Sequence, residues 1–132
     1  MIEIDDLIGK PYAPNATGPD RYDCWGLVTE VARRAGIDLP DVNRPVDVEQ
    51  WDDLCDQYLG REFQVIGQPE PLAIVAMCFG DHWHAGIVLD DGSRFIHCVE
   101  NHKVSAPRID HPLWQPFIVG FYRYVGSRDL HS

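Results

Sequence analysis

The sequence predicts an α+β domain in which N-terminal helices pack on an antiparallel β-sheet. Two observations lead to this class. Apolar residues recur at helical spacing in the first half of the chain, whereas short runs rich in Val, Ile and Phe dominate the second half. In addition, an Asp-Gly turn joins two of these runs, which is typical of a β-hairpin. Helices followed by hairpin-linked strands are characteristic of α+β domains with antiparallel sheets.

The first predicted helix follows a loop. Residues 9–22 are rich in Gly and Pro and are expected to be irregular. Asp23 suits the N-cap, because its carboxylate can accept hydrogen bonds from the amides of the first turn. Gly36 is expected to end the helix, and Pro40 lies just beyond it. The apolar stripe of this helix consists of Leu27, Val28, Val31, Ala32 and Ala35.

A second helix is expected from Val46 to Leu59, with Trp51 and Cys55 on its apolar face and acidic residues on its solvated face. From residue 61 the period changes to that of strands, which are bounded by Gly, Pro or Asp. The expected strands cover residues 62–66, 72–79, 85–89, 94–98 and 118–125. Residues 90–93, Asp-Asp-Gly-Ser, are expected to turn a hairpin between the third and fourth of them.

The length of the chain favours one domain. Its 132 residues fit a single domain of ordinary size, to which we assign residues 1–125, with residues 126–132 as a C-terminal tail. The longest apolar run covers residues 72–79, whereas a membrane-spanning helix needs roughly 20 residues. The N-terminus has neither the basic nor the apolar segment of a signal peptide. We therefore expect cytoplasmic synthesis without a signal peptide, and no insertion into membranes.

The charge of the chain excludes a class of partners. Eleven Lys and Arg residues stand against 21 Asp and Glu residues, which gives a net charge of −10. Phosphate backbones and anionic lipid surfaces repel a chain of this charge. We therefore expect no nucleic-acid partner.

Cys24 is the first candidate for chemistry. It follows the predicted N-cap, so it lies in the first turn of the helix, where amide hydrogens and the helix dipole create partial positive charge. This environment favours the thiolate and lowers the pKa of a cysteine, which makes it a better nucleophile. The alternative is that Cys24 is a small buried apolar residue. Position alone does not decide between the two.

Histidines supply the candidate base for such a nucleophile. His84 precedes the strand Ala85–Leu89, and His97 lies in the next strand, across the Asp-Gly hairpin. In an antiparallel pair His97 can hold one ring nitrogen of His84, and the other nitrogen then faces the thiolate, as in a Cys-His-polar triad. His82 is a weaker candidate for the base. The remaining histidines are interpreted as surface or structural residues, namely His102, His111 and His131.

The four cysteines, at positions 24, 55, 78 and 98, show no C-x-x-C spacing, so a structural zinc site is not expected. Without a signal peptide, reduced thiols are the default. A metal site built from His82, His84, His97 and Cys98 is geometrically conceivable and stays open as an alternative. The sequence contains no dedicated metal motif, and we expect neither a metal nor a cofactor.

Taken together, the motifs between residues 9 and 97 resemble those of the NlpC/P60 family of papain-like cysteine peptidases. The family combines a Gly-x-Pro-Tyr loop with Asp-Cys-x-Gly-Leu-Val at the start of a helix that ends near Gly-Ile-x-Leu-Pro. A His-x-Gly-Ile strand follows, and then an apolar pair before a polar residue. The matching residues are Gly9, Pro11, Tyr12, Asp23, Cys24, Gly26, Leu27, Val28, Gly36, Ile37, Leu39, Pro40, His84, Gly86, Ile87, Phe95, Ile96 and His97.

The resemblance implies the papain-like NlpC/P60 fold and a thiol protease with a Cys-His-His triad. In that triad Cys24 is the nucleophile, His84 the base, and His97 the residue that orients the base. The implied substrate is a peptidoglycan stem peptide of the cell wall, hydrolysed between D-glutamate and diaminopimelate or lysine.

Three residues near Cys24, along the chain or in the first loop, are expected to bind substrate. The resemblance implies that Tyr12 lines the active site, and we expect Asp23 and Trp25 to contact substrate as well. Trp25 stands where many secreted members carry Ser, which makes the chain similar to the bacteriophage tail-associated branch of the family. That branch implies a phage or prophage protein, incorporated into the virion tail with tail proteins as partners and acting at the cell wall. The alternative is a catalytically silent structural or assembly module of a phage tail.

Overall fold

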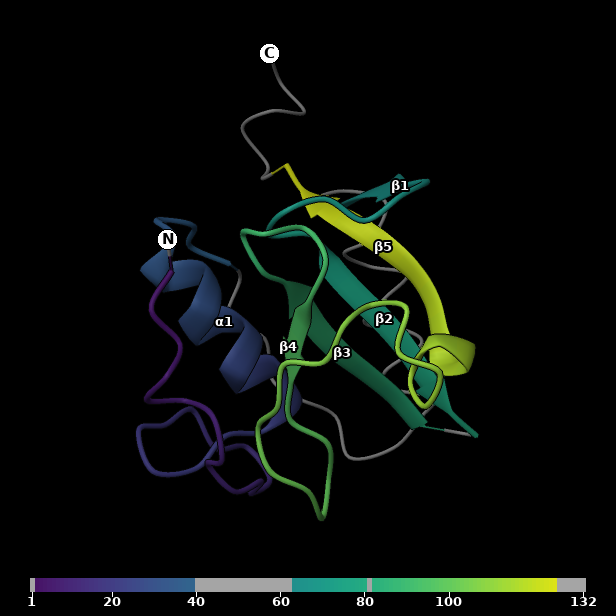
Figure 1. Ribbon diagram of the computed structural model, residues 1–132. Coiled ribbons are helices and arrows are strands. Elements are labelled where there is room, and N and C mark those ends of the chain that lie inside the picture. Colours follow the sequence, from purple (N-terminus) through teal and green to yellow (C-terminus); the bar gives the residue numbers. More distant parts are fainter. Residues whose placement is uncertain (1, 40–62, 81, 126–132) are drawn as a thin grey trace.

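The computed structural model describes residues 2–39, 63–80 and 82–125 and shows the α+β class that the sequence predicts (Figure 1). The predicted helix at residues 46–59 and the tail at residues 126–132 lie outside the described residues. The described elements, in chain order, are α1 (Cys24–Arg34), β1 (Phe63–Ile66), β2 (Ile74–Phe79), β3 (His82–Val88), β4 (Phe95–His97), the 3₁₀ helix η1 (Gln115–Phe117) and β5 (Ile118–Tyr124).

The strands form one antiparallel sheet in the order β1-β5-β2-β3-β4. The predicted hairpin joins β3 to β4, with the amide of Leu89 donating to the carbonyl oxygen of Arg94 at 2.8 Å and Gly92 at φ 75° in the turn. The strand β3 begins at His82, three residues before its predicted start. It does so because β2 continues as far as Phe79 and pairs with β3 along its whole length, Phe79 lying opposite His82.

Local sequence explains both ends of α1. The side chain of Asp23 accepts a hydrogen bond from the amide of Gly26 at 2.6 Å, which makes Asp23 the N-cap. At the other end Gly36 adopts φ 84°, and the amide of Ile37 donates to the carbonyl oxygen of Ala32 at 2.9 Å. This is the Schellman arrangement, which only a residue that tolerates positive φ supports without strain.

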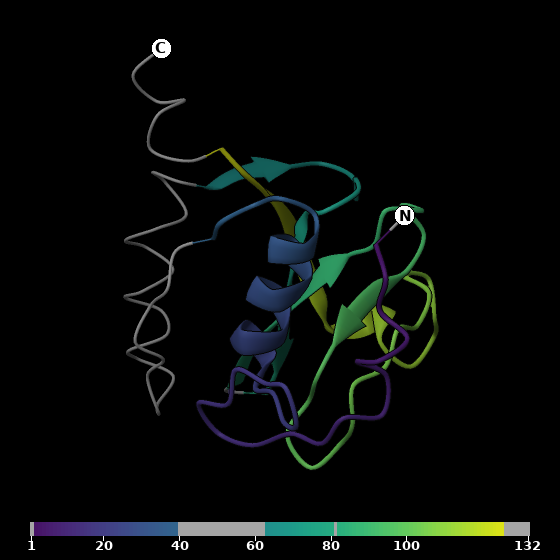
Figure 2. The same ribbon diagram turned by 90° about the vertical axis from the view of Figure 1, so that its left-hand side faces the viewer.

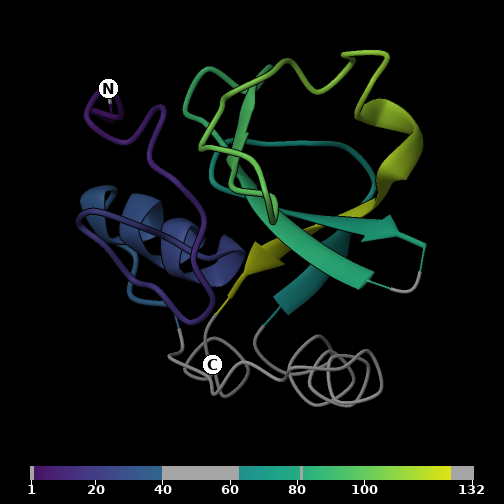
Figure 3. The ribbon, with the colours of Figure 1, turned by 90° about the horizontal axis from the view of Figure 1, so that it is seen from below.

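The two faces of the sheet bury different clusters, because side chains alternate along each strand. One face packs against α1, which lies in front of the sheet in Figure 2 and to one side of it in Figure 3. The sheet contributes Ile74, Ile87 and Ile96 to this first cluster. The opposite face buries a second cluster that contains Val75, Met77, Val88 and Phe95.

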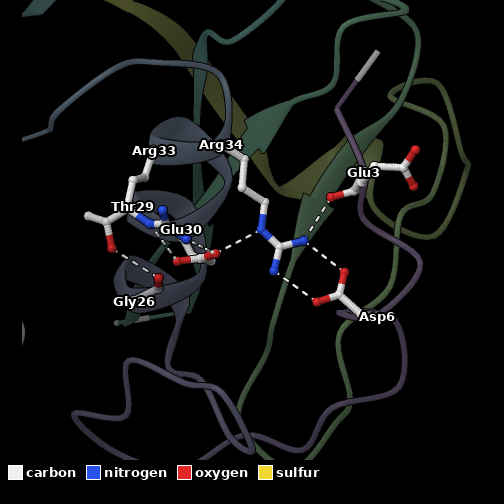
Figure 4. A network of polar contacts seen from close by, with 7 residues as sticks. All are labelled: Glu3, Asp6, Gly26, Thr29, Glu30, Arg33 and Arg34. Atoms are coloured by element: carbon white, nitrogen blue, oxygen red, sulfur yellow. Dashed lines mark hydrogen bonds and ion pairs between the residues drawn. The ribbon is translucent and has the colours of Figure 1, made fainter.

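The N-terminal segment ties α1 to the hairpin. Arg34 near the end of α1 binds both carboxylate oxygens of Asp6, at 2.7 and 2.8 Å, and also Glu30 at 2.7 Å and the carbonyl oxygen of Glu3 at 2.8 Å (Figure 4). The amide of Ile2 donates to the carboxylate of Asp90 in the hairpin turn at 2.9 Å. The bidentate pairing of Arg34 with Asp6 fixes orientation as well as distance.

No helix among the described residues is both long enough and apolar enough to cross a membrane.

Candidate active site

Cys24 is the first residue of α1, at the end where the helix dipole is positive. It is 8% exposed, and the capping carboxylate of Asp23 is 3% exposed. Gly26 lets the preceding loop approach this turn, because a Cβ at position 26 would collide with the carbonyl oxygen of Ala16. The same oxygen accepts a hydrogen bond from the amide of Asp23 at 2.9 Å. The Asp-Cys-x-Gly motif therefore has a local structural reason for its aspartate and its glycine.

The loop before α1 folds back and brings Tyr12 to the same place. The amide of Tyr22 donates to the carbonyl oxygen of Pro11, and the amide of Ala13 donates to that of Tyr22, each at 3.1 Å. Burial, followed by the negative charges of Cys24 and Asp23, raises the pKa of Tyr12 to about 12. The half-buried phenol therefore keeps its proton at neutral pH and can act as a hydrogen-bond donor.

His84 and His97 are bonded to each other within the sheet. Nε2 of His84 lies 3.0 Å from Nδ1 of His97, and the two side chains are only 8% and 1% exposed. The register places His97 directly opposite Gly86 and therefore diagonal to His84. The bond uses Nε2 of His84, so Nδ1 is the nitrogen of that ring that remains for other chemistry.

Gly86 is what allows this diagonal contact. A Cβ at position 86 would lie 2.9 Å from the carbonyl oxygen of Ile96 and 3.1 Å from both Cβ of His97 and Cδ2 of Phe95. Real Cβ atoms rarely approach so closely, so any larger residue would push the His97 side chain away from β3. The glycine of the His-x-Gly motif thus has a packing role on the neighbouring strand.

Both histidines are held in the neutral form. Burial, followed by the charge of His97, lowers the pKa of His84 to about 3. Burial, followed by the charge of His102, lowers the pKa of His97 to about 4. A bond between two neutral imidazoles contains one proton, so one ring donates and the other accepts. When His84 donates from Nε2, its Nδ1 is an acceptor and can serve as a base.

Three aromatic side chains surround the histidine pair. Phe79 lies 5.5 Å from the ring of His84, measured between ring centroids. Phe95 and Trp114 each lie 4.7 Å from the ring of His97. Neither Phe79 nor Trp114 was predicted from the sequence to lie at this site, because neither belongs to a motif and Trp114 reaches the pair from a segment far along the chain.

The thiol of Cys98 lies on the face of the sheet that packs against α1. Burial, followed by the negative charges of Cys24 and Asp23, raises the pKa of Cys98 to about 11. Its Sγ donates to the carbonyl oxygen of Tyr22 at 3.6 Å, and it packs in the cluster that contains α1. Among the described residues, Cys24, Cys78 and Cys98 lie outside any disulfide. Nowhere in this part of the chain do three His, Cys, Asp or Glu side chains gather to hold a metal ion.

The structure thus forms two groups of candidate residues. Tyr12, Asp23 and Cys24 gather at the start of α1, while His84 and His97 form the pair in the sheet. α1 packs mainly against β3 and then against β4, the strands that carry the two histidines. Trp25 is buried in the first cluster, where its ring meets that of Phe63 at 6.3 Å. Its role in substrate binding stays a prediction.

Comparison with known proteins supports the resemblance. The sequence model of the NlpC/P60 family matches residues 9–123. An NLP/P60 family protein described as similar to a lipoprotein, from Staphylococcus aureus, superposes with a TM-score of 0.59 at 24% identity, covering 90% of this chain and 38% of that one. NlpC2 from Trichomonas vaginalis gives 0.62 at 20% identity, with coverage of 92% and 44%. This chain therefore spans less than half the length of either. No curated protein matches.

Proposed function

Because the chain belongs to the NlpC/P60 family, we propose that it is a cysteine peptidase that hydrolyses peptidoglycan stem peptides, between D-glutamate and diaminopimelate or lysine. NlpC/P60 proteins are generally cell-wall peptidases. The observation that carries the proposal is the buried bond of 3.0 Å between His84 and His97, on strands that pack against the helix that begins with Cys24. A base oriented by a second polar ring, on strands packed against a helix that begins with a cysteine, suits acyl transfer.

In the proposed reaction, Sγ of Cys24 attacks the carbonyl carbon of the scissile amide, and the thiol proton passes to Nδ1 of His84. Backbone amides of the first turn of α1, that of Cys24 among them, stabilise the oxyanion. Collapse of the tetrahedral intermediate breaks the carbon–nitrogen bond, and the amine leaves with the proton from His84. Water then attacks the thioester with His84 as base, which releases the acid and restores the thiol.

The electrostatics of the pair favour a particular timing for the first proton transfer. Burial lowers the pKa of His84 to about 3, so a permanent imidazolium is disfavoured in the free protein. His84 therefore acts as a neutral base that takes the proton while Cys24 attacks. His97 accepts the Nε2 hydrogen of His84 throughout, which keeps Nδ1 directed toward the thiol.

Substrate binding is assigned to Tyr12, Asp23 and Trp25. Tyr12 offers a phenol that stays protonated, since its pKa is raised to about 12, and Asp23 offers a carboxylate next to the nucleophile. Trp25, which follows Cys24 in α1, is only 8% exposed, so its proposed contact with substrate is confined to the small part of the residue that reaches the surface. We further propose that the protein is associated with a phage tail or a prophage and acts at the cell wall.

Incubation of the reduced protein with synthetic stem peptides, followed by mass spectrometry of the products, tests the proposed activity. The expected products are two fragments separated at the D-glutamyl bond, and iodoacetamide or the substitution Cys24→Ala is expected to abolish them. EDTA is expected to have no effect. A folded protein that cleaves no stem peptide would instead favour a silent structural module of the tail.

A further inference from the structure

The ring of His97 is enclosed by aromatic side chains. Its centroid lies 4.7 Å from that of Phe95 at an interplanar angle of 56°, and 4.7 Å from that of Trp114 at 89°. Its only side-chain hydrogen bond to a described residue is the one to His84. Since His97 is 1% exposed, ring packing and this single bond determine where its nitrogens point.

Trp114 reaches the pair from outside the sheet. It lies in the segment between β4 and β5, immediately before η1, which can be followed in Figure 1. Two backbone hydrogen bonds hold Trp114 there. Its amide donates to the carbonyl oxygen of His111 at 3.0 Å, and its carbonyl oxygen accepts from the amide of Phe117 at 2.9 Å. Its indole also meets Phe79 at 6.1 Å and 77°, and Phe79 in turn packs on His84. One side chain therefore contacts His97 and supports the aromatic neighbour of His84.

The bond between the histidines needs such support. The torsion that rotates an imidazole about its Cβ–Cγ bond is broad, so a single hydrogen bond does not define the plane of the ring. Edge-to-face contact between rings is directional, because the positive edge of one ring meets the negative face of the other. The perpendicular contact with Trp114 opposes rotation of His97 out of the plane that directs Nδ1 at His84.

We propose that Trp114 is a positioning residue for the histidine pair. Its indole holds the His97 ring in the plane from which Nδ1 accepts the Nε2 hydrogen of His84. The consequence for peptide hydrolysis rests on the function proposed above, whereas the consequence for the bond between the two rings does not. Removal of the indole leaves both histidines in the chain and disorders the bond between them.

Three substitutions separate a positioning role from simple packing. Trp114→Phe keeps an aromatic face, Trp114→Leu keeps an apolar side chain without a ring, and Trp114→Ala removes both. Leu113→Ala is the matched control, because Leu113 neighbours Trp114 in the same segment and is 59% exposed. Proton NMR of the histidine-¹⁵N-labelled protein, well below the melting temperature of each variant, follows the hydrogen shared by the two rings. Kinetics on a stem peptide give kcat and KM separately.

The expected result is a protected, downfield hydrogen signal in the wild type, Leu113→Ala and Trp114→Phe. The signal is expected to exchange with water in Trp114→Leu and Trp114→Ala. In the last two variants kcat is expected to fall by about tenfold or more with little change in KM, since misplaced catalytic groups slow the chemical step. An unchanged signal in folded Trp114→Ala, or equal behaviour of the Leu and Phe variants, would overturn the proposal. A wild-type protein without peptidase activity that still shows the expected NMR pattern would overturn the proposed function alone.

Discussion

The start of α1 and the histidine pair differ in how they are built. The start of α1 is built from residues that are close together in the sequence. Asp23 caps the turn that contains Cys24, and Gly26 leaves room for the loop that precedes the helix. The histidine pair is built from strands β3 and β4 and from the segment between β4 and β5. His97 on β4 reaches across Gly86 to His84 on β3, and Trp114 from that segment packs on the His97 ring. Local hydrogen bonds thus place the candidate nucleophile, whereas strand register and core packing place the candidate base. We expect the second region to depend more on distant substitutions.

After the loss of activity expected for Cys24→Ala, the largest expected effects come from substitutions of the histidine pair itself. His84→Ala is expected to lower kcat/KM on a stem peptide by about 10³-fold or more, because it removes the proposed base. His97→Ala is expected to lower kcat/KM less, by about 10²-fold, because the proposed base remains but is misoriented. His97→Asn and His97→Gln should recover part of this loss, since an amide oxygen accepts the same hydrogen bond.

His82→Ala is the control for these variants and is expected to be mild. A severe effect of His82→Ala together with a mild effect of His84→Ala would show that the base is misassigned. If His97→Asn were no better than His97→Ala, the orienting role of His97 would be refuted.

Gly86→Ala is expected to have the next largest effect, on both stability and activity. The added methyl group meets the backbone of Ile96 and the side chains of His97 and Phe95 at 2.9–3.1 Å. Overpacking of this kind costs typically about 1–3 kcal/mol of unfolding free energy, and it should also separate the two histidine rings. Urea unfolding and stem-peptide kinetics measure the two consequences.

Gly120→Ala provides the matched comparison for Gly86→Ala, because the nearest atoms to its added Cβ lie at 3.8 Å or beyond. It is expected to change neither activity nor stability by much. Equal effects of the two substitutions, whether large or small, would mean that the space beside His97 is no more restrictive than that beside Gly120.

Because the two histidines are buried in the neutral form, the unfolding free energy of the protein is expected to decrease in acid. The unfolded chain binds protons at histidines with a pKa near 6.5, whereas burial keeps the pKa of His84 at about 3 and that of His97 at about 4. Between these values the unfolded state holds more protons, so the unfolding free energy decreases as the pH falls. The expected slope is at most about 1.4 kcal/mol per pH unit for each buried histidine.

Urea unfolding at a series of pH values between 7 and 4.5 tests this dependence. His97→Asn removes one titrating ring and keeps a hydrogen-bond acceptor, so it should show a smaller slope than the wild type. A slope that is unchanged in His97→Asn would show that other groups dominate the acid sensitivity.

The smallest and most selective effect is expected in thiol chemistry. Cys78 is more exposed than Cys24. Among the three cysteines that the structure describes, however, only Cys24 lies at the N-terminus of a helix, and that helix packs on the strands that carry His84 and His97. Cys98 should react slowly, because burial and the neighbouring negative charges raise its pKa to about 11. We therefore expect limiting iodoacetamide to label Cys24 first. Peptide mapping checks the order, and earlier labelling of Cys78 would mean that exposure outweighs thiolate character.

The sequence predicted most of the regular structure because its signals are local. The helix boundaries follow from Asp23 and Gly36, and the hairpin follows from its Asp-Gly turn. The start of β3 was predicted three residues too late, because strand pairing with β2 decides where that strand begins. The second helix, at residues 46–59, lies outside the described residues and stays a prediction.

The sequence by itself determined the cap, the placement of Cys24 at a helix N-terminus and the motifs of the family, because each depends on residues within a turn or two of one another. Only the tertiary structure decided that Nε2 of His84 meets Nδ1 of His97, that Gly86 must be small, and that Trp114 packs on the ring of His97. These contacts join residues from separate strands and loops. Their distances depend on strand register and on the filling of a shared core, and neither is encoded in the spacing of the residues along the chain.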